Sequence, residues 1–217
     1  MKRVVVYSCI TGVIDSLKTE QRWGDADWVL FTDQKFKGGN WWVQPAPDMF
    51  TNPRRNARLM KTTSHRLFPD HEYSIWIDGS IQLLHSPEWL IDTYMGNNDL
   101  AALTHPDRDC VFEEAEMCKQ LEKDDPRIID RQMARYKENG LSPHSGLAET
   151  KIVIRKNSGR VARFNDDWTL EILNNSLRDQ LSFNYCALKN LLPIKYLNSW
   201  KNSEDVKYYH HDQKTDK

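Results

Sequence analysis

The stretch Tyr73–Ser80 constrains the fold more than any other part of the chain. Its first residues, Tyr73–Ile77, form a short apolar run rich in β-forming side chains, which predicts a strand buried on both faces. Asp78, Gly79 and Ser80 follow directly. An unpaired carboxylate is costly to bury, and ligands of open α/β sheets bind beyond the carboxyl ends of the strands. We therefore expect Asp78 to face a ligand or a metal; the alternative is an Asp that starts an ordinary turn.

Similar runs elsewhere predict further strands of one sheet. They are Val4–Ser8, Trp28–Asp33, Trp41–Val43, Leu100–His105 and Lys151–Arg155. Helical patterns alternate with these runs and begin near Pro53, Pro87, Val111, Pro126, Val161 and Arg178. The alternation predicts an α/β fold whose mostly parallel central sheet is flanked by helices. We expect a single domain over residues 1–209, followed by a polar tail over residues 210–217.

The charge balance argues against nucleic acid as the main partner. The chain has 30 Lys and Arg residues against 31 Asp and Glu residues, so it lacks a global basic field. Apolar runs fall short of a membrane span, and the first residues, Met1–Tyr7, predict a strand and not a signal peptide. The simplest expectation is a cytoplasmic protein.

The cysteines do not predict a metal site. Cys9, Cys110, Cys118 and Cys186 form no CxxC pair, and nothing in their spacing demands an oxidising compartment. A zinc site built from His105, Cys110 and Cys118 would lack the paired spacings that are typical of structural zinc. Thiols that pack in the core are the favoured interpretation.

Polar residues follow two of the predicted strands and outline a nucleotide pocket. The first strand leads to Thr11 and Gly12, and the second ends in Thr32 and Asp33. In such a pocket a carboxylate or a backbone amide can bind the base or a ribose hydroxyl. The alternative is that Thr32 and Asp33 only start a turn.

The helix that begins at Pro53 carries a basic stripe. Thr51 or Asn52 is its expected cap, with Pro53 at the first helical position. The stripe consists of Arg54, Arg58, Lys61 and His65, and the opposite, core-facing side consists of Met60, Thr63 and Leu67. Arginine forks and lysine ammonium groups both suit phosphate. We expect Arg58 and Lys61 to reach a diphosphate; a solvated face is the alternative.

Three later segments carry further candidates. Glu149 lies in a predicted loop of small residues and is a candidate catalytic or acceptor-binding carboxylate, or an edge-strand charge. Asp179 and Gln180 lie in the first turn of the last helix, with Ser176 as the expected cap, although the helix dipole alone would favour an acidic residue there. His210 and His211 could ligate a metal or be tail residues without a role.

Six segments, taken together, resemble a known family. They are Arg55–Lys61, Ile75–Ser80, His105–Cys110, Glu113–Ala115, Gly146–Thr150 and Arg178–Phe183. In this order they resemble the glycosyltransferase-like domain of plant mucilage and pectin synthesis proteins and its bacterial and viral relatives. The resemblance covers the chain from Tyr7 to about Tyr209.

That family is similar to nucleotide-sugar transferases of the GT-A fold, a single Rossmann-like domain. There an Asp-x-Asp motif holds a divalent cation, Mn²⁺ or Mg²⁺, that binds the donor diphosphate. The resemblance makes Asp78 the first carboxylate of this motif, with Ser80 in place of the second, which implies a weakened metal site. It also implies a late histidine, His210 or His211, in the metal shell. By the same resemblance Asp179 and Gln180 contact the donor sugar, and Thr11, Gly12 and Asp33 line the nucleotide.

The resemblance therefore implies a hexosyl- or pentosyltransferase of polysaccharide biosynthesis. A nucleotide-diphosphate sugar would be the donor, and a glycan or another hydroxyl-bearing molecule the acceptor. The cation, Arg58 and Lys61 would neutralise the diphosphate, and Glu149 or Asp179 would be the base. The alternatives are a metal-dependent hydrolase of amides or phosphoesters and a non-catalytic module that binds nucleotide sugars. Nucleic acid as acceptor is disfavoured by the neutral charge.

Overall fold

Strand β1 (Val4–Ile10) lies inside a seven-stranded sheet of order β3-β2-β1-β4-β7-β6-β8. The computed structural model describes residues 2–12, 17–18, 20–36 and 38–209. The other strands are β2 (Ala26–Thr32), β3 (Trp42–Pro45), β4 (Tyr73–Ile77), β6 (Leu100–Thr104), β7 (Ala148–Lys156) and β8 (Ile194–Leu197). All neighbours pair in parallel except β7, which runs antiparallel to both β4 and β6. The predicted α/β fold with a mostly parallel sheet is confirmed.

The residues of β1 alternate between two hydrophobic cores, one on each face of the sheet. Val5, Tyr7 and Cys9 contribute to the first core, and Val4 and Val6 contribute to the second. Successive side chains of a strand point to opposite faces. A strand that is apolar at every position therefore has to lie between two covered faces.

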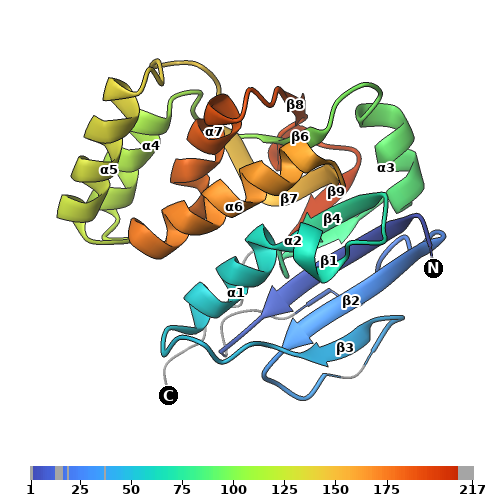
Figure 1. Ribbon diagram of the computed structural model, residues 1–217. Helices are drawn as coiled ribbons and strands as arrows, with labels where there is room; N and C mark the ends of the chain where they lie inside the picture. Colours follow the sequence, from blue (N-terminus) through green and yellow to red (C-terminus); the bar gives the residue numbers. More distant parts are fainter. Residues whose placement is uncertain (1, 13–16, 19, 37, 210–217) are drawn as a thin grey trace.

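Helices cover the first face of the sheet (Figure 1). They are α1 (Pro53–Thr62), α2 (Ser64–Leu67), α4 (Val111–Gln120), α5 (Pro126–Glu138), α6 (Gly159–Asn174) and α7 (Asp179–Lys189). The second face is covered by α3 (Pro87–Tyr94) and by a separate ribbon in which β5 (Ile81–Leu83) pairs with β9 (Val206–Tyr208). A short 3₁₀ helix, Trp200–Asn202, precedes β9. Among the described helices, none has the length and apolar character that crossing a bilayer requires.

The start of α1 is confirmed. The Asn52 side chain accepts a hydrogen bond from the Arg54 amide at 3.0 Å, and Pro53 occupies the first turn, where its missing N–H costs nothing. This cap fixes where the first turn of α1 begins. It thereby sets which residues of the helix face the sheet.

The prediction of one continuous basic stripe is wrong. Helix α1 ends at Thr62, and α2 begins at Ser64. The Thr63 hydroxyl donates to the Leu59 carbonyl at 2.8 Å, a local bond that competes with helix continuation. His65 consequently contacts Asp166 of α6 at 3.1 Å instead of extending the stripe. Lys61 is fully buried, so it belongs to the core-facing side.

Three further features of the secondary structure differ from the prediction. Glu149 belongs to strand β7 and not to a loop, because β6 pairs with it after a register shift between Ala102 and Leu103. Ser176 does not cap α7, which begins at Asp179; its hydroxyl instead donates to Asp124 at 2.7 Å. The short strands β8 and β9 were not predicted, because half-exposed three- or four-residue segments carry little periodic signal.

A buried polar network joins the sheet to the end of α1. Arg155 of β7 donates to the Lys61 carbonyl at 2.9 Å and to the Asn165 side chain at 2.9 Å. It also donates to the Tyr7 hydroxyl, which in turn donates to the Lys61 carbonyl at 2.9 Å. The last carbonyls of a helix lack intrahelical partners and carry negative partial charge. The guanidinium therefore satisfies these carbonyls and fixes α1 over the sheet.

Replacing Tyr7 by Phe should destabilise the protein by about 2–3 kcal/mol, because the buried guanidinium of Arg155 loses an acceptor and the Lys61 carbonyl loses a donor. Urea denaturation measures the free energy of unfolding. The matched control is Tyr209→Phe, which removes a partly exposed hydroxyl bonded to Gln82 and should cost less than about 1 kcal/mol. Equal losses in the two variants would contradict the prediction.

Candidate active site

A cavity of about 340 Å³ opens where several elements end. The carboxyl ends of β1 and β4 meet the first residues of β7, which share this edge because β7 runs antiparallel. The first turns of α1 and α7 complete the wall. Its charged lining residues are Arg54, Arg58, Asp78, Lys123, Glu149, Lys151, Arg178 and Asp179. The topology thus brings half of the predicted site residues into the wall of one cavity, namely Thr11, Arg58, Asp78, Glu149, Asp179 and Gln180.

A buried ion pair lies in the wall of this cavity. The Lys61 ammonium lies 2.6 Å from one Asp179 carboxylate oxygen, and the Arg58 guanidinium lies 2.9 Å from the other. Thr150 donates to Asp179 at 2.8 Å and accepts from Lys61 at 3.1 Å. The side chains of Lys61 and Asp179 are 1% and 3% exposed. Both charges are therefore out of water and surrounded by their partners.

These contacts fix the charge of Asp179. Burial alone would raise the pKa of this carboxyl, but the charges of Arg58 and Lys61 hold its pKa well below the usual range. The carboxylate is ionised, and both its oxygens are engaged. It can position Lys61 and Arg58, but a poor proton affinity makes it a weak general base.

Asp78 lies beside this ion pair, directly after β4. Its Oδ1 atom accepts from the indole of Trp76 at 2.6 Å and lies 3.5 Å from the Lys61 ammonium. The cavity wall contains Asp78 and Gly79, whereas Ser80 is absent from the described lining residues. Ser80 is buried, with its hydroxyl unbonded among the described residues.

A cation bound at Asp78, which stays a prediction, would need ligands beyond this carboxylate. No second Asp, Glu, His or Cys of the described part of the chain joins Asp78 in a group of three close ligand atoms. A hard divalent cation prefers six or more oxygen ligands, while Lys61 already supplies positive charge at Oδ1. His210 and His211 lie outside the described residues. The predicted histidine ligands thus stay a prediction.

Two buried donors in the wall lack acceptors. The Nε2 atom of Gln180 and the Nε atom of Arg178 are buried and form no hydrogen bond with any described residue. Gln180 is 4% exposed, and both residues line the cavity. Buried donors without acceptors are uncommon and call for an explanation such as a bound ligand. Oxygen-rich molecules would supply the missing acceptors.

Glu149 is the second carboxylate of the wall. It is 9% exposed, and its Oε2 atom lies 3.0 Å from the Lys151 ammonium. Unlike Asp179, it has one ion-pair partner among the described residues, so it keeps lone pairs for a ligand. This makes it the better placed proton acceptor of the two.

The predicted nucleotide-binding residues lie next to one another at the ends of β1 and β2. The Gly12 amide donates to the Asp33 carboxylate at 2.8 Å, and the Thr11 hydroxyl donates to the Pro53 carbonyl at 2.5 Å. Thr11 lines the cavity, whereas Gly12 and Asp33 are not among its described lining residues. Their bond ties the ends of the two strands together next to Thr11.

The sequence prediction missed several lining residues. They are Arg54, Lys123, Thr150, Lys151 and Arg178. Thr150 and Arg178 belong to the segments that carry the family resemblance and directly adjoin Glu149 and Asp179, which is a signal that could have identified them. Lys123 follows α4 and reaches the cavity only through the tertiary fold. No local pattern marks it.

Comparison with known proteins places the chain among glycosyltransferase-like domains. A family model described as "TOD1/MUCI70, glycosyltransferase-like domain" matches residues 9–207. The "Probable hexosyltransferase MUCI70" of Arabidopsis thaliana is 32% identical over 162 residues, which are 70% of this chain and 28% of that protein. The "Alkaline ceramidase TOD1" of Arabidopsis thaliana is 30% identical over 152 residues, 65% of this chain and 33% of that protein. The chain thus spans about a third or less of these curated relatives.

Solved structures share the fold. The bifunctional glycosyltransferase WbbM matches with a TM-score of 0.51 and 10% identity, over 90% of this chain and 39% of that one. The galactosyltransferase LgtC, solved with donor and acceptor sugar analogues, matches with a TM-score of 0.50 and 12% identity, over 90% of this chain and 73% of that one. The predicted GT-A-type fold is therefore confirmed at the level of architecture.

Replacing Asp179 by Asn should destabilise the protein at neutral pH by about 3–5 kcal/mol, because it leaves Lys61 buried without its closest counter-charge. The folded-state pKa of Asp179 is depressed, so its charge stabilises the fold above the unfolded pKa of about 3.9. That stabilisation is lost as the pH falls below this value.

The difference between the wild type and Asp179→Asn, followed from about pH 6 to pH 3, should consequently stay constant down to about pH 5 and shrink at lower pH. Urea denaturation over this range measures it. The control is Asp25→Asn at an exposed ion pair with Lys2, which should cost less than about 1 kcal/mol. A difference for Asp179→Asn that stays constant with pH would contradict the assignment.

Proposed function

The chain belongs to the TOD1/MUCI70 glycosyltransferase-like domain family, and from this premise we propose that it is a glycosyltransferase that moves a hexosyl group from a nucleotide-diphosphate sugar to a hydroxyl of a glycan. The observation that carries the proposal is the pair of buried donors without acceptors, on Gln180 and Arg178, in the wall of a positively charged cavity. Hydroxyl and phosphate oxygens of such a donor would accept these bonds.

The charge of the cavity wall favours a diphosphate as the ligand. Five basic and three acidic side chains line it. Asp179 and Glu149 are bound to Arg58, Lys61 and Lys151. Arg54, Lys123 and Arg178 form no side-chain ion pair with any described residue. These three basic side chains face the cavity and have no carboxylate partner among the described residues. They therefore favour an anionic ligand.

In this proposal the diphosphate binds the unpaired cations, and the Asp179 carboxylate holds Arg58 and Lys61 in place. A direct displacement needs the acceptor oxygen to bond to the anomeric carbon while the bond from that carbon to the diphosphate oxygen breaks. The nucleoside diphosphate leaves with the bonding electrons. Fixed positive charge at the leaving oxygens lowers the barrier because it stabilises the charge that develops there.

Glu149 is our candidate for the base that takes the acceptor proton. It lies in the same wall as Gln180, and within the described part of the chain Lys151 is its one ion-pair partner. Gln180 is assigned to the donor sugar, and Thr11, Gly12 and Asp33 to the nucleoside end. Asp179 becomes a positioning residue, since its engaged oxygens suit it poorly for proton transfer.

A divalent cation is not needed for this account. In the cavity wall Asp78 lies 3.5 Å from the Lys61 ammonium, so a basic side chain occupies the place where the charge of a cation would act. Mn²⁺ or Mg²⁺ bound through Asp78 stays a prediction, to which Ser80, His210 or His211 would have to contribute. Nucleotide binding measured with and without manganese distinguishes neutralisation by basic side chains from neutralisation by a bound cation.

Ceramide hydrolysis is the activity that the name of one relative states. For this chain the cavity argues against it, because half of its sixteen described lining residues are charged. A substrate with two long alkyl chains would bury apolar surface against these charges at a high cost. A hydroxyl- and phosphate-rich donor matches them better.

The wider biology of the chain is proposed on the same basis. We place it in polysaccharide biosynthesis, with a glycan acceptor and a nucleotide sugar as its partners, and in the cytoplasm, where nucleotide sugars would be accessible to it. Cell fractionation of the tagged full-length protein tests the location. A membrane-bound or secreted protein would contradict it.

Nucleoside diphosphates should raise the melting temperature of the protein, because a ligand that binds only the folded state stabilises it by mass action. We would screen UDP, GDP and CDP, each with and without manganese. Gln180→Ala should weaken binding of the best nucleotide sugar by about tenfold or more, since hydrogen bonds to a buried donor are lost. Gln120→Ala, at an exposed position of α4, is the control.

Stabilisation without manganese would support neutralisation by the basic side chains alone. Stabilisation that needs manganese and disappears in Asp78→Ala would restore the metal-assisted mechanism. If no nucleotide or nucleotide sugar shifts the melting temperature, the proposal is wrong and assays for amide and phosphoester hydrolysis follow.

Glu149→Gln should lower kcat for sugar transfer by about 10²–10⁴-fold, the usual contribution of a general base. Nucleotide-sugar affinity should change less than about threefold, because the amide keeps the size of the carboxylate and Lys151 remains near the cavity. Steady-state kinetics and calorimetry measure the two quantities. Glu138→Gln, at the exposed end of α5, is the control. An unchanged kcat would remove Glu149 from this role.

A further inference from the structure

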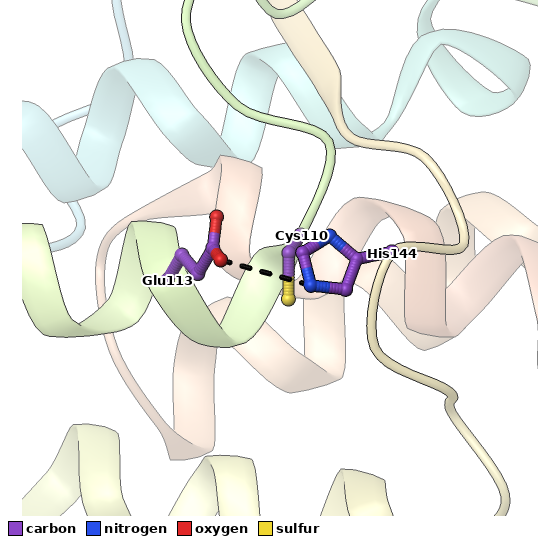
Figure 2. Close-up of side chains that lie close together, drawn as sticks. All are labelled: Cys110, Glu113 and His144. Atoms are coloured by element: carbon purple, nitrogen blue, oxygen red, sulfur yellow. Dashed lines mark ion pairs between the residues drawn. The ribbon is translucent and has the colours of Figure 1, made fainter.

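Three side chains outside the cavity bring metal-binding atoms together (Figure 2). Cys110 precedes α4, Glu113 lies in its first turn, and His144 belongs to the segment between α5 and β7. One ligand atom of each lies within 4.8 Å of the other two. The His144 Nε2 atom is 3.7 Å from the Glu113 carboxylate. A thiol, a carboxylate and an imidazole are all ligands that zinc accepts.

The imidazole of His144 is already oriented by a second carboxylate. Its Nδ1 atom lies 2.7 Å from Asp109 Oδ1. A carboxylate can only accept, so Nδ1 carries the proton of this bond and the lone pair of the neutral ring lies on Nε2. Histidines that bind metals typically donate their other ring N–H to a carboxylate in this way. The arrangement presents Nε2 to Glu113.

The thiol of Cys110 is not engaged by any other residue that the structure describes. The residue is 2% exposed, and its sulfur forms no hydrogen bond with any described residue. Cys118, which lies within α4, differs because its sulfur lies 3.5 Å from a Glu114 carboxylate oxygen in the core. Cys110 is therefore a buried, unpartnered ligand atom that faces an imidazole nitrogen and a carboxylate.

We propose that Cys110, Glu113 and His144 bind Zn²⁺ or a similar thiophilic divalent cation, with Asp109 as the residue that orients His144. Bond lengths of about 2.0–2.3 Å in a tetrahedral site place ligand atoms roughly 3.5 Å apart. Glu113 and His144 are about half exposed, so these two side chains can close around an ion held by the buried thiolate. Three protein ligands leave one position for water or another donor.

Such an ion would link the start of α4 to the segment between α5 and β7. The segment that carries His144 continues into Leu147, whose carbonyl accepts from the His105 amide at 2.9 Å, and then into Glu149 of the cavity. The zinc site would therefore stabilise the support of the candidate active site. It is independent of the proposed function, because none of its three ligands lines the cavity.

Cobalt is the probe, because a Co²⁺–thiolate bond has a charge-transfer absorption that no carboxylate or imidazole site produces. The full chain is stripped with a chelator, kept reduced and titrated with Co²⁺, then with Zn²⁺. We expect one equivalent of cobalt, a thiolate band, and displacement by zinc. Saturating zinc should raise the melting temperature of the stripped protein by about 5 °C.

The variants separate this site from the other thiols and from Asp78. The thiolate band should be lost in Cys110→Ala and in His144→Asn, which keeps a residue tolerant of the positive φ of 52° at this position. Asp109→Asn should weaken zinc binding by about 10–100-fold. Cys118→Ala, Asp78→Ala and Glu116→Gln are the controls that should keep the band.

Two results would overturn the proposal. One is a wild-type protein without a thiolate band, which would mean that His144 only bridges Asp109 and Glu113 as an ion pair. The other is a band that survives both Cys110→Ala and His144→Asn. His144→Asn decides the question alone if the buried Cys110→Ala variant fails to fold, because His144 is exposed.

Discussion

The candidate active site depends on one buried ion pair, Lys61 with Asp179. It joins the end of α1 to the first turn of α7, and through Thr150 and Asp78 it also contacts β7 and the end of β4. Taking two charges out of water costs several kcal/mol per ion unless geometry and further hydrogen bonds compensate. Here both ions have additional polar partners, and these partners come from all four elements. The ion pair therefore favours the arrangement of α1, α7, β7 and β4 that surrounds the cavity.

The same lysine connects the cavity to the core below it. While its ammonium faces Asp179, its backbone carbonyl accepts from Tyr7 and from Arg155. These two residues lie on β1 and β7, which are strands of the sheet that α1 covers. The position of the Lys61 ammonium is thus set both by Asp179 and by the hydrogen bonds to the Lys61 carbonyl. A cavity that must hold cations at fixed places gains from such a rigid base, because preorganised charge needs no reorganisation during the reaction.

The sequence predicted the features that depend only on a few neighbouring residues. The bounds of β4 and the start of α1 followed from an apolar run and from a cap with proline, both of which act within a few residues. The burial of Lys61 could not be predicted in this way, because its helix pattern matches that of a solvated basic stripe and its main partner is Asp179, more than a hundred residues away. The place of Glu149 in β7 likewise depends on pairing with β6. The grouping of Cys110 with His144 requires the tertiary fold, which is why cysteine spacing gave no metal signal.

Several buried polar groups form no hydrogen bond with any described residue. The residues around each group indicate whether it faces a ligand, a metal or neither. Ser80 has an unbonded buried hydroxyl, yet it is not among the described residues of the cavity wall, so it gives no evidence of a ligand. Gln180 and Arg178 have donors in that wall that no described residue accepts, and several cations there have no carboxylate partner in the same part of the chain. Cys110 has an unbonded thiol that faces other ligand atoms. A donor in a cationic cavity calls for an oxygen-rich anion, whereas a thiol among an imidazole and carboxylates calls for a metal. The chemistry of the neighbours, more than the unsatisfied atom itself, therefore separates a substrate site from a cation site in this fold.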